Sequence, residues 1–143
     1  MVNLKAITQA VETLLNAGLT GYQIERNPMR PSEPWKASVN TAWVGIYRGD
    51  TDYEGHSIGA MPWLANINII IEIQVASALS ADDCENRLLD AEKAVIDVIN
   101  SNRTLSGTVD MVIGYSVNYE VNADSRTYYQ AAIITVRTQV RTS

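Results

Sequence analysis

The residues that could do chemistry are few in this chain, and the densest group of them is an acidic stretch. The segment from Asp50 to Gly55 reads DTDYEG, with oxygen-bearing side chains at alternate positions and a glycine at the sixth position. This pattern matches the first half of a calcium-binding loop. The match then fails, because Met61 stands where such a loop needs a bidentate glutamate. We therefore interpret the segment as a solvated acidic loop and keep calcium binding by Asp50, Asp52 and Glu54 as an alternative.

Histidine and cysteine offer little for catalysis or metal binding. His56 is the only histidine and Cys84 the only cysteine, whereas a zinc site needs several such ligands together. A Cys–His nucleophile pair is not excluded by spacing, but Cys84 falls on the apolar stripe of a predicted helix, where cysteine is usually a small buried hydrophobic residue. The sequence also lacks G-x-S-x-G, G-x-G-x-x-G and Walker motifs. We expect no enzyme activity, no cofactor, and no catalytic or metal site.

Composition narrows the class of protein further. The chain has 143 residues, which fits a single domain over residues 1–143. Its net charge of −5 argues against a sequence-independent nucleic-acid binder, which needs a basic surface. Only 19% of the residues are charged, which suits a protein that hides part of its surface in an assembly. We find no segment able to span a bilayer and no signal peptide, and we therefore expect a soluble protein in the cytoplasm.

Two segments have the periodicity of amphipathic helices. The first carries an apolar stripe of Leu4, Ile7, Val11 and Leu14. We expect Asn3 to cap its start and Gly18 to end it in a left-handed conformation. The second begins at Ser80, runs to about Asn102, and has acidic residues in its first turn, where the helix dipole favours them. Its stripe consists of Cys84, Leu88, Ala91, Val95 and Val98.

Strand patterns fill most of the remaining sequence. The clearest is the alternation between Asn66 and Val75, whose one face is entirely Ile and Val. Two further strands, near 109–122 and 127–141, predict a long antiparallel hairpin. Shorter strands are predicted at 21–26 and 41–48, separated by a proline-containing loop with Pro28, Pro31 and Pro34, and a polar loop is predicted at 49–62. The order predicts an α+β two-layer sandwich, in which two amphipathic helices cover a mostly antiparallel sheet of four to five strands.

Aromatic residues border the two predicted loops, and they are our candidates for an interface. Tryptophans near loops are enriched at protein interfaces and are also ordinary residues at the edge of a core, and both interpretations stay open. Loop length and aromatic content single out one arginine and one tyrosine beside them. The candidate interface residues are Trp35, Trp43, Arg48, Tyr53 and Trp63.

The order of these elements resembles that of the tail terminator (tail-completion) proteins of long-tailed bacteriophages, over nearly the full chain. The helix AITQAVETLLNAG leads to a strand, a proline-containing loop, and a strand ending near YRGDTDYEG. The strand NINIIIEIQVAS then runs into the helix SADDCENRLLDAEKAVIDVIN, and the strands VDMVIGYSVNYEV and YYQAAIITVRTQV close the chain. The most telling positions are Trp63, Ile69, Ile71 and Glu72 before a helix carrying Asp82, Leu88 and Lys93, with Val95 two places later than the family pattern.

This resemblance implies a structural role in the virion. Such proteins form a hexameric ring on the head-proximal end of the tail tube, stop its polymerisation, and offer a surface to a head-completion or neck protein. DNA passes through the pore without specific binding, and we expect acidic residues to outnumber basic ones on its wall. The resemblance implies a protein of the virion tail that is assembled in the host cytoplasm. Replacing Trp35 or Trp63 by alanine is then expected to weaken tail joining while the fold stays intact.

Two further alternatives remain beside the calcium-binding module. A head-completion or neck connector protein would differ in its partner, and gene order beside a tail tube gene would separate the two. A small ligand-binding or enzymatic α+β domain would instead show a concave pocket with converging polar groups.

Overall fold

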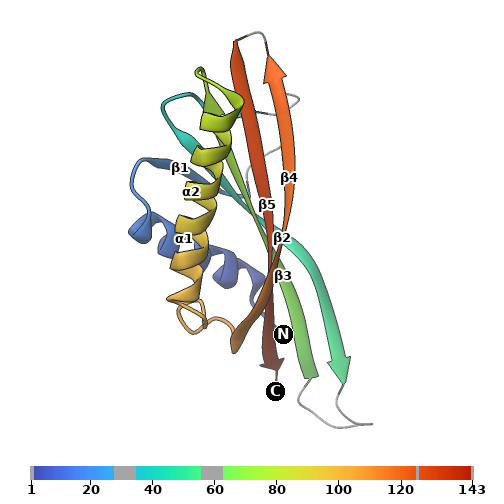
Figure 1. Ribbon diagram of the computed structural model, residues 1–143. Coiled ribbons are helices and arrows are strands. Elements are labelled where there is room, and N and C mark those ends of the chain that lie inside the picture. Colours follow the sequence, from blue (N-terminus) through green and yellow to red (C-terminus); the bar gives the residue numbers. More distant parts are fainter. Residues whose placement is uncertain (1, 28–34, 56–62, 125, 143) are drawn as a thin grey trace.

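Two helices cover one face of a five-stranded sheet in the computed structural model, which describes residues 2–27, 35–55, 63–124 and 126–142 (Figure 1). The sheet order is β1-β2-β3-β5-β4, with β1 parallel to β2 and all other neighbours antiparallel. This confirms the predicted α+β class with its long C-terminal hairpin. The elements are α1 (Leu4–Gly18), β1 (Tyr22–Arg26), β2 (Ala42–Gly55), β3 (Trp63–Ser77), α2 (Ala81–Asn100), β4 (Met111–Asp124) and β5 (Thr127–Thr142).

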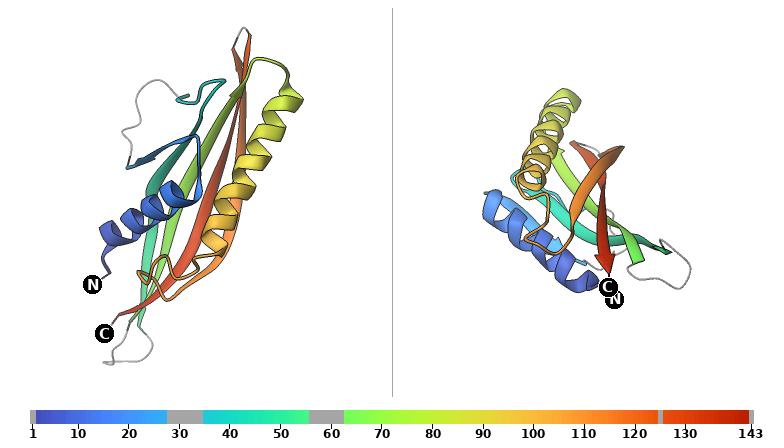
Figure 2. Two further views of the ribbon diagram at one scale, coloured as in Figure 1. Left: turned by 90° about the vertical axis from the view of Figure 1, so that its left-hand side faces the viewer. Right: turned by 90° about the horizontal axis from the view of Figure 1, so that it is seen from below.

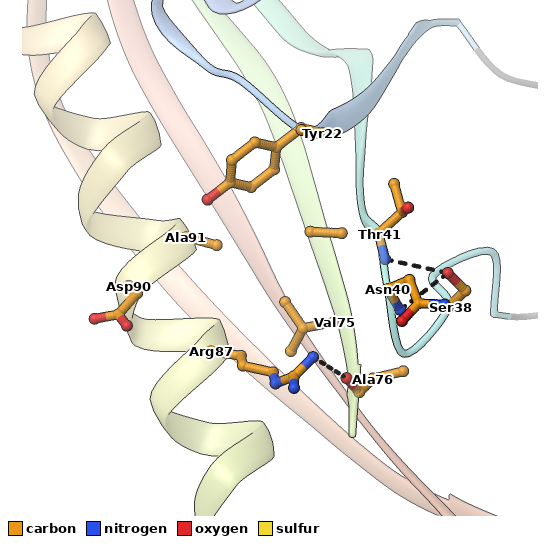
Figure 3. Close-up of a pocket in the computed structure, with 11 residues that line it drawn as sticks. Tyr22, Ser38, Asn40, Thr41, Val75, Ala76, Arg87, Asp90 and Ala91 are labelled. Carbon is orange, nitrogen blue, oxygen red and sulfur yellow. Dashed lines mark hydrogen bonds between the residues drawn. The ribbon is translucent and has the colours of Figure 1, made fainter. Parts of the chain in front are cut away.

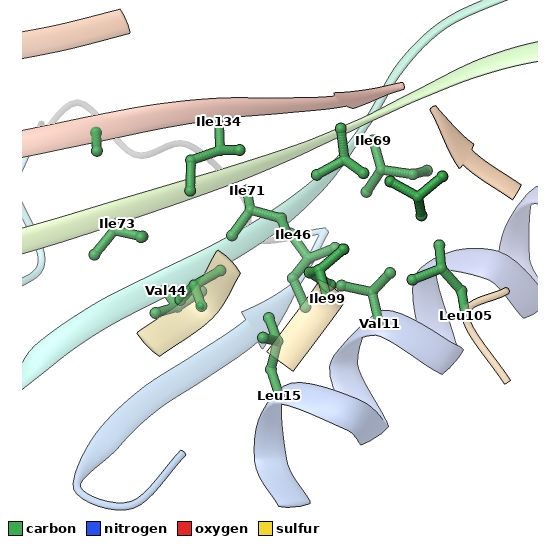
Figure 4. Packing of buried hydrophobic residues seen from close by; sticks show 14 of the residues in the cluster. Val11, Leu15, Val44, Ile46, Ile69, Ile71, Ile73, Ile99, Leu105 and Ile134 are labelled. Atoms are coloured by element: carbon green, nitrogen blue, oxygen red, sulfur yellow. The ribbon is translucent and has the colours of Figure 1, made fainter. Parts of the chain in front are cut away.

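The main core lies between the two helices and the sheet. The isoleucines of β3 that were predicted to share one face, such as Ile69 and Ile71, are fully buried there. They meet Val11 and Leu15 of α1 and Ile99 of α2 (Figure 4). Burial of each such side chain contributes roughly 1.5–3 kcal/mol, so this layer supplies most of the stability of the fold.

Both helices begin where the sequence predicts, but the details of their ends differ from the predictions. The Asn3 side chain accepts a hydrogen bond from Ala6 N, and Ser80 Oγ accepts one from Asp83 N. The first helix ends at Gly18 as predicted, but the predicted left-handed conformation is wrong, because Gly18 is still helical and an extended Leu19 follows it. A positive φ of 84° occurs instead at Gly21, in the turn before β1. Gly18 has another use, since a Cβ there would overlap Val98 of α2.

The strand β2 is longer than predicted, and this corrects the polar loop expected at 49–62. Residues 49–55 continue the strand and pair with the start of β3, after a register shift between Arg48 and Thr51. The acidic residues therefore lie in an extended strand, which is not the helix-flanked loop that binds calcium. His56, Met61 and the three prolines lie outside the described residues.

The sheet is longer than the layer of helices that covers it. The end of β4 and the start of β5 lie at one end of the molecule, and the end of β2 and the start of β3 lie at the other, beyond α1 and α2 (Figures 1 and 2). The views also place all helix on one side of the sheet, which leaves the opposite face, called here the open face, without helices. No helix within the described ranges has the length and apolar character needed to cross a membrane.

Candidate assembly surfaces

The candidate interface residues separate into two groups at opposite ends of β2. Trp43 lies near its start, paired with Gln74 of β3, whereas Tyr53 lies near its far end, paired with Ala65. Arg48 and Trp63 belong to the far group, because Arg48 precedes the register shift and Trp63 opens β3 opposite Gly55. Trp35 belongs with Trp43, since both lie on the open face. The five residues therefore do not form one continuous surface.

A short segment laid across the open face holds the first group together. The backbone N–H groups of Lys36 and Ala37 both donate to Gln74 Oε1, at 2.7 and 3.3 Å. Gln74 Nε2 donates in turn to Glu72 Oε2 at 2.7 Å, and both side chains are buried. The ring of Trp35 stacks on Tyr129, with 5.4 Å between centroids. The segment therefore covers Trp43, which forms a second, smaller core with Ala37 and Ala76.

Trp43 is the centre of that smaller core. Its side chain is 1% exposed and packs with Ala37 and Ala76. The ammonium of Lys36 lies 5.2 Å from the ring centroid, and a Cβ on Gly45 would overlap the ring, so glycine is required beneath it. A contact with another protein through Trp43 stays a prediction, whereas its packing role is visible in the fold.

The far end of β2 is exposed and acidic. Arg48, Asp50, Asp52, Tyr53 and Glu54 are all exposed, with Tyr53 at 41%. The parallel neighbour β1 covers the outer edge of β2 only along residues 42–46. The outer edge of the stretch 47–55 therefore faces away from the sheet with no strand beside it among the described residues. Trp63 starts the adjacent strand, and its contacts remain a prediction.

The outer edge of β4 is a further surface, which the five candidate interface residues do not include. β4 is paired with β5 alone in the described sheet, and it exposes Met111, Ile113, Tyr119 and Val121. Its sequence contains no proline or lysine, residues that commonly protect an edge strand from pairing. Only its start is covered, because Arg103 bonds the backbone N–H and C=O of Val112 beside a register shift between Val112 and Gly114. The absence of proline and lysine is readable in the sequence. Only the strand order shows that β4 lies at the edge of the sheet, because β5 separates it from β3.

A pocket of about 290 Å³ lies between α2 and the turn that precedes β2 (Figure 3). Its polar residues are Tyr22, Ser38, Asn40, Thr41, Arg87 and Asp90. The guanidinium is committed to structure, because Arg87 Nη1 donates to Val39 O at 2.7 Å and Nε donates to Asp83 Oδ2 at 2.9 Å. Burial, with a smaller effect of Asp90, raises the pKa of Tyr22 and keeps the phenol neutral. The pocket thus offers mainly engaged or neutral groups to a ligand.

The start of α2 carries the most connected charged group. The Ser77 hydroxyl donates to Asp83 Oδ2 at 2.6 Å, and Arg87 donates to the same oxygen. The Ser77 hydroxyl, and then the charge and hydrogen bond of Arg87, lower the pKa of Asp83. Cys84, one residue on, is buried as predicted, and burial raises the pKa of its thiol. These groups join α2 to the end of β3, so we interpret them as structural.

Metal ligands do not gather within the described part of the chain, where no three His, Cys, Asp or Glu side chains form a candidate group. Asp52 and Glu54 share one face of the strand, since they pair with Asn66 and Leu64 of β3.

The fold is an α+β sandwich with two exposed sheet edges among the described residues, and comparisons with known proteins add little. No protein-family model matches the chain, and no curated protein matches it. Among solved structures, the chain is similar to one described as "Virion of native gene transfer agent (GTA) particle". The TM-score is 0.35 at 9% sequence identity, over 94% of this chain and 92% of the other. A similarity at that level carries no argument about the role of this chain.

Proposed function

We propose that the chain is a structural virion protein, the tail terminator of a long-tailed bacteriophage. Copies of it form a ring on the head-proximal end of the tail tube, stop tube polymerisation, and present the surface to which the head is joined. The proposal has no chemical step, and the chain acts without a cofactor. It is supported by the order of the sequence elements, which the fold follows, and by the surfaces that the fold leaves exposed.

The observation that carries the proposal is the outer edge of β4 beyond the register shift between Val112 and Gly114, where no other described strand pairs with it. At Val112 itself the backbone N–H and C=O are both bonded to Arg103. Unpaired N–H and C=O groups on an edge strand are a template for association, and monomeric proteins usually block them. Here the open part of the edge runs from Tyr115 to Asp124, with Tyr119 54% exposed and Val121 73% exposed. A protein that works inside an assembly needs no such protection, because its edge is covered by a neighbour.

Closed rings follow when identical subunits join head-to-tail through two different surfaces and the rotation closes. The chain has two such surfaces, the edge of β4 and the outer edge of β2 along residues 47–55, on opposite sides of one sheet. Six subunits is the expectation from the family resemblance.

Negative-stain electron microscopy of the purified protein over rising concentration, with mass measured in parallel, tests the ring. A closed ring with a central hole is the expected result, either alone or after purified tail tubes are added. A protein that stays monomeric and leaves tube ends bare would contradict the proposal. It would return attention to the pocket beside α2 and to a ligand-binding role.

A second measurement separates the terminator from a head-completion or neck connector protein. When the gene is removed from the genome that encodes it, loss of a terminator leaves unjoined tails of irregular, excessive length. Loss of a connector leaves unjoined tails of normal length. Tail lengths in electron micrographs therefore decide between the two roles.

A further inference from the structure

We infer that neighbouring copies of this chain pair through two flanks of opposite charge, which lie at opposite edges of the sheet. The acidic flank consists of Asp50, Asp52 and Glu54 in β2. The basic flank consists of Arg103, Arg137 and Arg141, beside and within the strands β4 and β5. The inference rests on the proposed function and adds which surfaces join the subunits and in what orientation.

The acidic flank is free to meet a partner. Asp50, Asp52 and Glu54 are exposed, and Arg48 is the only basic residue in the stretch 47–55. β1 ends alongside Ile46, so it covers the outer edge of β2 only before this stretch begins. Within the described residues, none of the three carboxylates forms an ion pair.

The basic flank gathers three exposed arginines around the start of β4. Arg103 Nη2 donates to Val112 O at 3.0 Å, which holds its guanidinium at the outer edge. The guanidinium of Arg137 lies over Gly114, where Nη2 would be 2.5 Å from a Cβ. Arg141 follows on β5, and its backbone N–H donates to Asp110 Oδ2 at 2.8 Å. The three guanidinium groups also form no ion pair with another described residue.

The strand register places the two flanks at the same height. Asp52 pairs with Asn66, Asn66 with Gln139, and Gln139 with Met111, so Asp52 and Met111 end one row across the sheet. The row through Glu54 ends similarly, through Leu64, at Arg141. Rotation of a copy about an axis along the strands therefore brings the acidic flank of one copy level with the basic flank of the next.

Strand direction favours the same arrangement. β2 is antiparallel to β3, β3 to β5 and β5 to β4, so β4 runs opposite to β2. In a head-to-tail ring, the two facing strands of neighbours therefore run antiparallel, which is the commoner relation between neighbouring strands. At the start of β4 they meet through side chains, because Arg103 already bonds both backbone groups of Val112. Exposed apolar side chains lie at this height on both flanks, Tyr53 on one and Met111 and Ile113 on the other. They supply an apolar centre, and the charges around it give direction and specificity.

Charge reversal on either flank tests the inference. We compare the full chain with D52R/E54R, which makes both flanks basic, and with R137E/R141E, which makes both flanks acidic. Sedimentation velocity over rising concentration should show that each variant self-associates about tenfold or more weakly than the original chain, because like charges then face each other. An equimolar mixture of the two variants should recover association, since every flank again meets its opposite.

Matched controls separate a surface effect from a folding effect. E85R, near the start of α2, and R126E, directly before β5, reverse one exposed charge each at the end of the sheet away from both flanks, and they should associate like the original chain. Circular dichroism melts should show that all variants are folded, because the six flank residues are exposed. Association of the original chain should weaken with added salt, which screens exposed charges.

Each outcome bears on one claim. Rings that form unchanged in both reversal variants, or no gain on mixing them, would overturn the inference and leave the terminator role standing. Rescue on mixing, with open chains in place of closed rings under the microscope, would support the flanks and count against the ring. An original chain that does not self-associate at any concentration would overturn the pairing, and the terminator role would then depend on the tube-end measurement alone.

Discussion

Burial distinguishes two of the tryptophans, because Trp43 is fully buried whereas Trp35 is only partly buried. Trp43 is buried beneath the segment 35–39, and Trp35 lies over Tyr129 at the rim of the same cluster. The indole N–H of Trp43 is buried without an acceptor among the described residues. Its contribution to stability therefore comes from packing, with no hydrogen bond to add to it.

Replacing Trp43 by alanine should lower the free energy of unfolding by about 3–5 kcal/mol, the range for truncation of a buried aromatic side chain. Trp43→Phe should cost clearly less, because it keeps an aromatic ring and removes the unpaired N–H. Urea denaturation of both variants measures the difference. An alanine variant as stable as the original chain would show that the ring is not part of the core.

The carboxyl group of Asp83 should make stability depend on acid. The Ser77 hydroxyl, followed by Arg87, lowers its pKa below the value of an unfolded chain. A lowered folded-state pKa means that the stabilisation is present above the unfolded pKa of about 3.9. It is then lost as the pH falls through the folded value.

Asp83→Asn should therefore be less stable than the original chain near pH 7, and the gap should shrink below about pH 4. Thermal melts across this pH range measure it. Asp82→Asn is the control, because that neighbouring carboxylate is not hydrogen-bonded to Ser77 or Arg87 in the fold. An equal gap at every pH would assign the effect of Asp83→Asn to packing.

Whole elements differ in how far the sequence alone could predict them. α2 and β3 were predictable because each has one unbroken apolar face and, for α2, a serine at the cap. The far end of β2 was not, because Gly49, Asp50 and Asp52 are typical of loops. Their strand conformation comes from pairing with β3 across a register shift. The left-handed conformation predicted for Gly18 was wrong for a related reason. Close contact with Val98 of α2 favours glycine at this position, and no left-handed turn is needed to explain it.

The cap of α2 gives a prediction at this scale. Ser80→Ala removes the oxygen that accepts from Asp83 N at 3.0 Å, and it should cost about 1 kcal/mol of unfolding free energy. Ser101→Ala, at the exposed other end of the same helix, should cost much less. Chemical denaturation of the two variants provides the comparison, and equal costs would contradict the capping role.

The whole molecule depends on an arrangement that no single segment encodes. The sequence predicts a hairpin of β4 and β5, yet either strand of a hairpin can be the inner one. Only in the folded sheet does β5 pair with β3 along its full length and leave β4 outside. The same order places Asp52 and Met111 at opposite ends of one row. Candidate contact residues on β2 were therefore accessible from the sequence, whereas the opposing flank required the strand order.

Charge at the scale of the whole chain sets its relation to DNA. The net charge is −5, and nonspecific binding of duplex DNA needs several cationic groups directed at phosphates. In the proposed ring, Arg103, Arg137 and Arg141 face carboxylates of the next subunit and are not available. A pore built this way repels the DNA that passes through it and does not hold it.

We therefore expect fluorescence anisotropy of a labelled duplex to show binding weaker than about 10⁻⁴ M at physiological salt. The D52R/E54R variant is the positive control, because it adds cationic groups and should raise the affinity measurably at low salt. Tight binding by the original chain, lost as salt is added, would mean that a basic surface faces the pore. That result would contradict the acidic pore wall and would require the arginines of the basic flank to face DNA instead of a neighbouring subunit.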